Sequence, residues 1–320
     1  MKIGVFAVLF ADRSLDETLD HLVSLGIEAV EVGAGAYPGN AHCNPDQLLR
    51  EESRLRAFRE AFDGRGLTIS ALSCHGNPLH PQTAIARSHH IAFEQTVKLA
   101  SKIGVERVIT FSGCPGGGPQ ETKPNWIVSA WPPEFPEMLD WQWNERVIPY
   151  WREAARACAA ANVKVAIEMH PNFVAYNPET MLRLIDVAPA TIGCNFDPSH
   201  MFWQGIDPVA AIRALGEHIY HVHAKDCRID ARNTALNGVL DVKKYTRALE
   251  RSWIFRTIGY GNDALVWKDI ITALRLVGYD HVISIEHEDS AMSAGEGLRK
   301  AISFLKEILI VEPAGEAYWA

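Results

Sequence analysis

A strand-like segment followed by a helix-like segment recurs eight times along the 320-residue chain. Each strand-like segment is a short apolar run, often β-branched, and the stretch after it has the spacing of an amphipathic helix. Strands that alternate with helices pair in parallel, and eight such units favour a closed (β/α)8 TIM barrel. We therefore predict a single TIM-barrel domain over residues 1–320. The predicted strands are residues 2–10, 29–32, 67–73, 107–111, 164–169, 191–197, 219–223 and 281–286.

Two of the predicted connections are too long to be simple turns. Residues 112–140 follow the fourth strand and are rich in glycine and proline, with tryptophans at Trp126 and Trp131. Residues 227–266 follow the seventh strand and include a predicted helical segment at residues 241–251. Loops of this length usually act as lids or contact partners. Both should lie at the carboxyl ends of the strands, the face on which barrel active sites are built.

Composition and charge exclude several functional classes. The formal net charge is −8 without a dense run of Lys or Arg, which argues against a nucleic-acid surface. No apolar run reaches the roughly 20 residues that span a bilayer. The six cysteines form no C-x-x-C pair, and Asp12 and Arg13 interrupt the apolar N-terminal run before it resembles a signal peptide. We expect a cytoplasmic protein with no nucleic-acid or membrane partner.

Metal-competent side chains stand at the ends of the last four predicted strands. Each strand is apolar until its end and then delivers one carboxylate or imidazole, and in a barrel these ends converge over one point. A single polar residue at a strand end is ordinarily solvated or caps a helix, but four in consecutive strands indicate a site. Three carboxylates and one imidazole suit one divalent ion, Mn²⁺ first, with Mg²⁺, Co²⁺ or Zn²⁺ as alternatives. The four predicted ligands are Glu168, Asp197, His223 and Glu286.

These residues also carry a resemblance to a known family. Glu168, Asp197-Pro-Ser-His200, His223-Ala-Lys-Asp226 and Ile285-Glu286-His-Glu resemble the xylose isomerase-like superfamily of sugar phosphate isomerases and epimerases, with a metal site similar to that of ketose 3-epimerases. The resemblance implies that Glu168 and Glu286 exchange a proton at a carbon next to a carbonyl, through an enediolate. It further implies that Asp197 and His223 mainly hold the ion. Substrate contacts are implied for His200 and Arg228.

Several other polar residues are candidates for the same mouth. Glu31 ends the second predicted strand, His75 ends the third, and His170 follows Glu168 by two residues. We predict that all three contact the substrate, although a loop histidine satisfied by backbone is the alternative for His75. Asp226 is predicted either to orient a neighbouring metal ligand from behind or to cap the next turn.

Two departures from the ketose 3-epimerases bear on the substrate. Val174 stands where those enzymes carry a glutamate that grips the end of the sugar, and the long loop at residues 112–140 is absent from them. We therefore expect a modified or larger carbohydrate as the substrate of an isomerase or epimerase. The alternatives are a lyase that eliminates from a 3-keto-glycoside, an endonuclease IV-like repair enzyme and a non-catalytic sugar-binding subunit. A homo-oligomer or a small partner subunit is compatible with the sequence.

Overall fold

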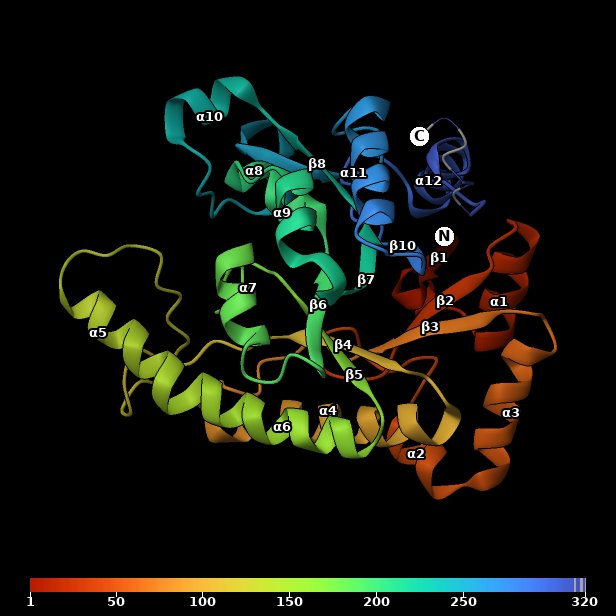
Figure 1. Ribbon diagram of the computed structural model, residues 1–320, viewed down its shortest axis with the longest axis horizontal. Helices are drawn as coiled ribbons and strands as arrows, with labels where there is room; N and C mark the ends of the chain where they lie inside the picture. The colour runs from red at the N-terminus through yellow and green to blue at the C-terminus, as the bar shows by residue number, and fades with distance from the viewer. Residues whose placement is uncertain (314, 317–318, 320) are drawn as a thin grey trace.

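The computed structural model describes residues 1–313, 315–316 and 319, and it confirms the predicted barrel. Eight parallel strands close in the order β1-β10-β7-β6-β5-β4-β3-β2. Helices from the intervening segments surround the strands (Figure 1). The barrel strands are β1 (Lys2–Phe6), β2 (Ala29–Gly33), β3 (Thr68–Ser73), β4 (Arg107–Phe111), β5 (Lys164–Glu168), β6 (Ile192–Phe196), β7 (Ile219–Ala224) and β10 (Val282–Ile285).

Several helices begin at residues whose side chains satisfy free backbone N–H groups. The Ser14 hydroxyl accepts a hydrogen bond from the backbone N–H of Glu17, and the Glu17 carboxylate accepts one from the backbone N–H of Ser14, which forms a capping box. Asn177 caps another helix in the same way and is followed by Pro178. The helices are α1 (Leu15–Ser24), α2 (Pro45–Arg50), α3 (Glu52–Asp63), α4 (Thr83–Ile103), α5 (Glu134–Trp141), α6 (Ile148–Ala160), α7 (Pro178–Ile185), α8 (Pro198–Gln204), α9 (Pro208–Leu215), α10 (Ala231–Asn237), α11 (Ala264–Leu276) and α12 (Ala294–Ile308).

Alternation along each strand divides its side chains between two environments. Val30 and Val32 of β2 face the helices and belong to the main hydrophobic core, and so do Ile283 and Ile285 of β10. The residue between Val30 and Val32 is Glu31, which therefore points into the barrel. Because successive side chains alternate in this way, only every second residue of a strand can reach a site at the barrel axis.

Some boundaries differ from the predicted ones. The first strand was predicted to reach residue 10 but ends at Phe6, and Ala7–Phe10 forms a short 3-10 helix. The helix before β4 begins at Thr83. The helical stretch before β5 is continuous, because α5 runs through a π-helical turn at Gln142–Val147 into α6.

The 227–266 insertion contains a hairpin that the sequence did not reveal. Strands β8 (Asp226–Ile229) and β9 (Trp253–Arg256) pair antiparallel, outside the barrel sheet. The segment predicted as helical near residues 241–251 holds a 3-10 helix at Tyr245–Glu250. Both strands have four residues and a long separation in sequence, so no local pattern marks their pairing.

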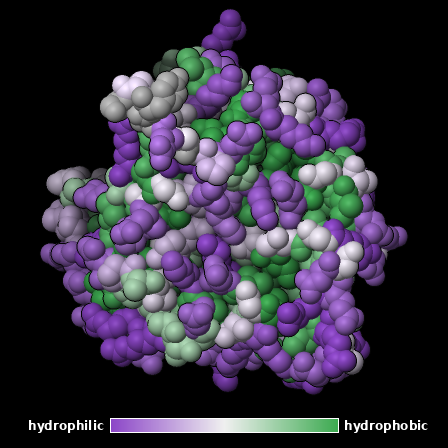
Figure 2. All heavy atoms as spheres, turned by 45° about the vertical axis from the view of Figure 1, so that its right-hand side comes forward, coloured by the Kyte–Doolittle hydropathy of each residue, from purple (hydrophilic) through white to green (hydrophobic). Residues whose placement is uncertain are grey.

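The surface of the protein and the state of its cysteines can be compared with what the composition predicts. Hydrophilic side chains cover most of the face shown in Figure 2, with hydrophobic groups scattered between them. None of the helices in the described part of the chain is long and apolar enough to cross a membrane. All six cysteines are buried free thiols.

Candidate metal centre

The four predicted ligands meet at the carboxyl end of the barrel. Glu168 ends β5, His223 lies in β7, and Asp197 and Glu286 directly follow β6 and β10. Each can offer one ligand atom such that all four atoms lie within 4.8 Å of one another. His223 Nδ1 lies 3.0 Å from Glu286 Oε2 and 3.3 Å from Glu168 Oε2. The side chains are buried except that of Glu286, which is 16% exposed and so is the one reachable from the mouth.

The donor atoms of this cluster fit a divalent cation. Asp197 Oδ2 and Glu286 Oε2 are buried without a hydrogen bond of acceptable geometry, a costly arrangement unless a cation faces them. The Nζ atom of Lys225 lies 3.1 Å from the first oxygen and 2.8 Å from the second. Lys225 offsets one of the three carboxylate charges, and a divalent ion would offset the other two. The charges and the donor atoms therefore fit a divalent cation.

Lys225 was not among the predicted site residues. It is 2% exposed, and Asp197 and Glu286 raise its pKa well above the usual range, although burial acts in the opposite direction. The signal was available, because Lys225 follows His223 by two residues. Alternation along the chain puts the two side chains on the same side.

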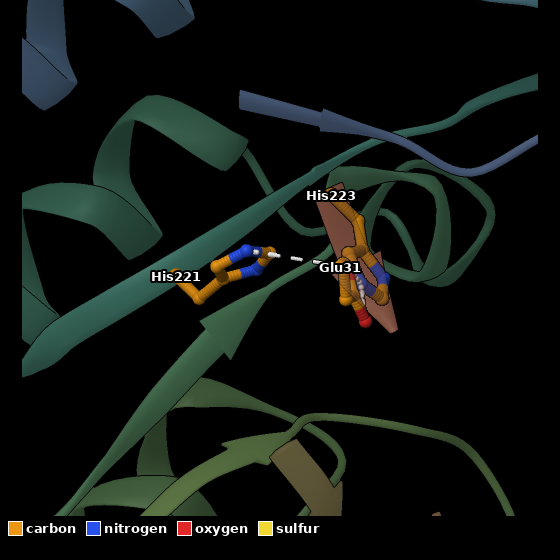
Figure 3. A group of neighbouring side chains, drawn as sticks. All are labelled: Glu31, His221 and His223. Atoms are coloured by element: carbon orange, nitrogen blue, oxygen red, sulfur yellow. Dashed lines mark hydrogen bonds and ion pairs between the residues drawn. The ribbon is translucent and has the colours of Figure 1, made fainter. Parts of the chain in front are cut away.

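His223 is held from below by the carboxylate of Glu31. The Nε2 atom of His223 lies 3.0 Å from Glu31 Oε2, so Nδ1 is the nitrogen left to face a metal. Ser73 Oγ donates to Glu31 over 2.5 Å and Ser284 Oγ over 2.8 Å. Burial raises the pKa of Glu31, but His223 outweighs it and lowers the pKa to about 2. Figure 3 shows Glu31 beside His223, with His221 on the other side of the carboxylate. Glu31, predicted at the mouth, is instead fully buried beneath the site.

Two more buried polar residues, Asn195 and His221, lie beneath the predicted ligands together with Glu31. Asn195 donates from Nδ2 to Glu168 Oε2 over 3.0 Å, and its Oδ1 lies 3.0 Å from His221 Nδ1. Burial lowers the pKa of His221 to about 3, so its imidazole is neutral at physiological pH. Asn195 precedes Asp197, and His221 precedes His223, by two residues. Sequence reasoning missed both, although the period of two could have placed them under the ligands. We call Glu31, Ser73, Asn195, His221 and Ser284 the polar layer.

The structure brings the three predicted mouth histidines to Glu168. His75 Nε2 lies 2.9 Å from Glu168 Oε2, and His200 Nε2 lies 3.4 Å from Glu168 Oε1. The ring of His170 is 4.2 Å from that of His200, centre to centre. Burial raises the pKa of Glu168, but the neighbouring imidazoles of His200 and His75 outweigh it and hold the pKa well below its usual range. Glu168 is therefore an ionised carboxylate surrounded by donors.

Two predicted residues lie apart from the cluster. The guanidinium of Arg228 is exposed on β8 and donates to the Gly261 carbonyl over 3.0 Å. Asp226 accepts hydrogen bonds on Oδ2 from the backbone N–H groups of Gly259 and Gly261 and from the Trp267 indole. In the described part of the chain, the Asp226 carboxylate makes its hydrogen bonds with the 227–266 insertion and with α11 rather than with a predicted ligand. Asp226 thus ties down the insertion, which is closer to the predicted turn-capping alternative.

The fold and the site together define a class of protein. The chain belongs to the xylose isomerase-like TIM barrel family, whose model matches residues 19–308. It is also similar to the uncharacterized protein YfiH of Bacillus subtilis strain 168, with 36% identity over 312 residues, which cover 97% of this chain and 99% of that protein.

Solved structures share the fold at low sequence identity. The probable 3-DHS dehydratase AsbF from Bacillus anthracis superposes with a TM-score of 0.66 at 18% identity, over 96% of this chain and 99% of that one. The IOLI protein with a bound zinc atom gives 0.66 at 16% identity, over 97% and 98%. A D-psicose 3-epimerase crystallised with D-fructose gives 0.62 at 15% identity, over 97% and 99%.

Proposed function

We propose that this protein is a divalent-metal-dependent isomerase or epimerase that moves a proton at a carbon next to a carbonyl of a carbohydrate. The observation that supports this best is the convergence of Glu168 and Glu286 on His223 Nδ1, at 3.3 and 3.0 Å. Glu168 ends β5 and Glu286 follows β10, and the strands β6 and β7 lie between β5 and β10 in the barrel order. A substrate carbon held between them meets one carboxylate on each face.

The surrounding residues suit these roles. An ion held by Glu168, Asp197, His223 and Glu286 would polarise the substrate carbonyl and stabilise the enediolate. Glu168 is kept ionised by its histidine neighbours and can accept the proton. Glu286 is partly exposed and lies 2.8 Å from the Lys225 ammonium, which helps to keep the carboxylate ionised. His200 and His75 can hold substrate oxygens beside Glu168.

The ligand types also guide the choice of metal. Three carboxylates and one imidazole form a hard oxygen-rich set, which favours Mn²⁺ or Mg²⁺ over ions that prefer sulfur. A zinc atom occupies the similar IOLI structure, so Zn²⁺ and Co²⁺ are the alternatives to test. Loading the metal-free protein with each ion and measuring its binding stoichiometry should give one ion per chain.

Solvent exchange tests the proposed reaction. The Mn²⁺-loaded protein is incubated in D₂O with free ketoses and with 3-keto-glucosides, and NMR follows deuterium at the carbon next to the carbonyl. We expect exchange with the carbon skeleton intact, and loss of exchange in Glu168→Gln and Glu286→Gln. Full turnover in either variant would show that the acid/base assignment is wrong. A matched control is Glu28→Gln, which changes an exposed glutamate.

Elimination is a second candidate, and Lys225 is the observation that favours it. Its buried ammonium lies against Glu286 and can protonate a leaving group on the carbon beyond the enolate. The similar AsbF structure is that of a probable dehydratase, so the fold accommodates such chemistry in another protein. The same NMR experiment separates the two reactions. Release of an aglycone or of water indicates a lyase, whereas deuterium without release indicates an isomerase or epimerase.

A further inference from the structure

A cavity of about 310 Å³ lies between the two insertions, next to the metal centre. Trp126 and Val128 of the 112–140 insertion form one side of it. Tyr245, Trp253 and Phe255 of the 227–266 insertion form another. His170 and His200 also line it, so it adjoins the site around Glu168. We call this space the insertion cavity.

The aromatic wall of the insertion cavity is packed and anchored. Trp253 stacks on Trp203 with ring centres 4.8 Å apart and planes 6° from parallel. Tyr245 stacks on Phe255 at 5.7 Å, and the Arg251 guanidinium lies 4.2 Å from the Tyr245 ring. Such contacts hold flat rings in place at low entropic cost when a ligand arrives.

A carboxylate fixes the segment that carries this wall. Asp241 accepts hydrogen bonds from the backbone N–H groups of Ser252, over 2.7 Å, and Lys243, over 2.9 Å. Its side chain is fully buried, and although burial raises its pKa, these donors lower the pKa to about 2. The Asp241 carboxylate is thus occupied within the insertion and does not serve as a free charge in the cavity.

The lining indicates what kind of group would bind. Among the described residues that line the insertion cavity there is no Lys or Arg, so a phosphate would find no cationic partner. Flat aromatic faces without a cationic partner among the described lining residues suit a neutral ring that has an apolar face.

The insertion cavity lies beside the candidate metal centre, where it could hold a part of the substrate that does not react. His200 lines it and also lies 3.4 Å from both Glu168 and Asp197. Phe255 meets the His200 ring edge-on at 5.4 Å, and the Lys225 Nζ atom lies 4.7 Å from the Phe255 ring. A ring in the cavity and a carbonyl at the metal centre would therefore touch the same residues from two sides.

We infer that the insertion cavity binds a second, uncharged six-membered ring of the substrate, linked to the carbohydrate unit that reacts. The inference rests on the proposed function, because it names the substrate class of the same site. A volume near the lower end of ligand pockets, which begin at about 300 Å³, suits a single ring. The ring is either a pyranose, which packs its C–H face on the aromatic wall, or a phenyl group.

A substrate series tests this inference. The Mn²⁺-loaded protein is given 3-ketoglucose, methyl 3-keto-glucoside, phenyl 3-keto-glucoside and a 3-keto-disaccharide, and kcat/KM for exchange in D₂O is measured for each. We expect kcat/KM to be at least about tenfold higher for a substrate with two rings, equivalent to about 1.4 kcal/mol. Preference for the disaccharide identifies a sugar ring in the cavity, and preference for the phenyl compound identifies an aromatic one.

Matched variants tie the effect to the cavity. Trp126→Ala and Tyr245→Ala should lower kcat/KM about tenfold for the two-ring substrates and leave 3-ketoglucose unchanged. Trp131→Ala and Tyr260→Ala make the same changes on exposed residues of the same two insertions that do not line the cavity, and they should have no effect. Circular dichroism of each variant checks that it folds.

The possible failures are distinguishable. Equal kcat/KM for all four compounds, with exchange present, overturns the second-ring inference and leaves the proposed function standing. If no compound exchanges, the proposed function fails, and the cavity is judged by binding alone. For that, saturation-transfer NMR measures sucrose and phenyl glucoside on the protein. Binding that Trp126→Ala abolishes and Trp131→Ala preserves supports the cavity site, and its absence overturns it.

Discussion

The imidazole of His223 is bracketed by carboxylates, with its Nε2 atom 3.0 Å from Glu31 Oε2 and its Nδ1 atom 3.0 Å from Glu286 Oε2. Glu31 comes from β2 and His223 from β7, and the strands β1 and β10 lie between these two in the barrel order. The contact therefore crosses the barrel interior and depends on the closed sheet. It fixes the ring orientation and would leave Nδ1 free to face a metal ion, the arrangement in which a buried carboxylate strengthens a histidine ligand.

Glu31→Gln should weaken metal binding while the barrel stays folded. The amide cannot accept as strongly from His223 and loses the charge that favours its Nε2–H tautomer, so Mn²⁺ affinity should fall about 10- to 100-fold. Titration of free Mn²⁺ by electron paramagnetic resonance measures this. The control is Glu28→Gln, an exposed change three residues away. Unchanged affinity in Glu31→Gln would show that the contact does not position the ligand.

Metal binding should release protons at neutral pH, and affinity should rise with pH. Burial lowers the pKa of His223, but Glu31 and Glu286 outweigh it and raise the pKa well above the usual range. Without metal the ring is therefore protonated at pH 7, and a ligand nitrogen must be free of its proton. Calorimetry in buffers of different ionisation enthalpy counts the protons. Release of none at pH 7 would contradict a protonated His223 in the metal-free state.

Without metal, the raised pKa of His223 also makes the free energy of unfolding depend on pH. A group whose pKa is higher in the folded state stabilises fully below its unfolded pKa of about 6.5, and that contribution is lost as pH rises through the folded value. Glu31, with its pKa lowered to about 2, behaves in the opposite way, because its contribution is lost as pH falls towards 2. Urea unfolding of the EDTA-treated protein across pH measures both trends.

Asp226→Asn should loosen the 227–266 insertion and leave the metal affinity unchanged. Its carboxylate accepts from the backbone of Gly259 and Gly261 and from the Trp267 indole, so the amide leaves at least one buried donor unpaired, at a cost of about 1–3 kcal/mol. Urea unfolding and limited proteolysis within the insertion measure the change. Asp230→Asn, at the exposed start of α10, is the matched control. A large drop in Mn²⁺ affinity would instead support the predicted ligand-orienting role of Asp226.

A feature of the fold or of the candidate site could be predicted from the sequence when its pattern was local and repeated along the chain. The barrel was predictable because the strand–helix pattern recurs, and Glu168 and Asp197 were predictable because each stands where an apolar strand ends. Asn195 and Lys225 were missed because they look like ordinary strand or loop residues unless the period of two is followed beyond the ligands. The placement of Glu31 under His223 depends on barrel closure, which brings together residues 192 positions apart.

The β8–β9 hairpin marks the other limit. Its pairing of Arg228 with Ile254 joins residues that lie far apart in the sequence. The resemblance to ketose 3-epimerases had instead placed Arg228 near the substrate, where those enzymes have a gripping residue. In the structure the hairpin carries Arg228 to the exposed side. It carries Phe255 into the insertion cavity, a placement that only tertiary packing decides.

Lys225→Met should lower the stability of the metal-free protein and increase the stabilisation gained from metal. The buried ammonium lies 3.1 Å from Asp197 and 2.8 Å from Glu286, so its removal takes a cation away from both carboxylates, a change that costs about 3–5 kcal/mol for a buried pair. A bound divalent ion restores part of this loss, because it binds only the folded site. The rise in Tm between EDTA and Mn²⁺ should therefore be larger in Lys225→Met than in the parent protein. Lys243→Met, which removes the ion pair with Asp241, is the control and should lower both Tm values equally. An unchanged rise in Lys225→Met would mean that the ammonium and the metal do not neutralise the same carboxylates.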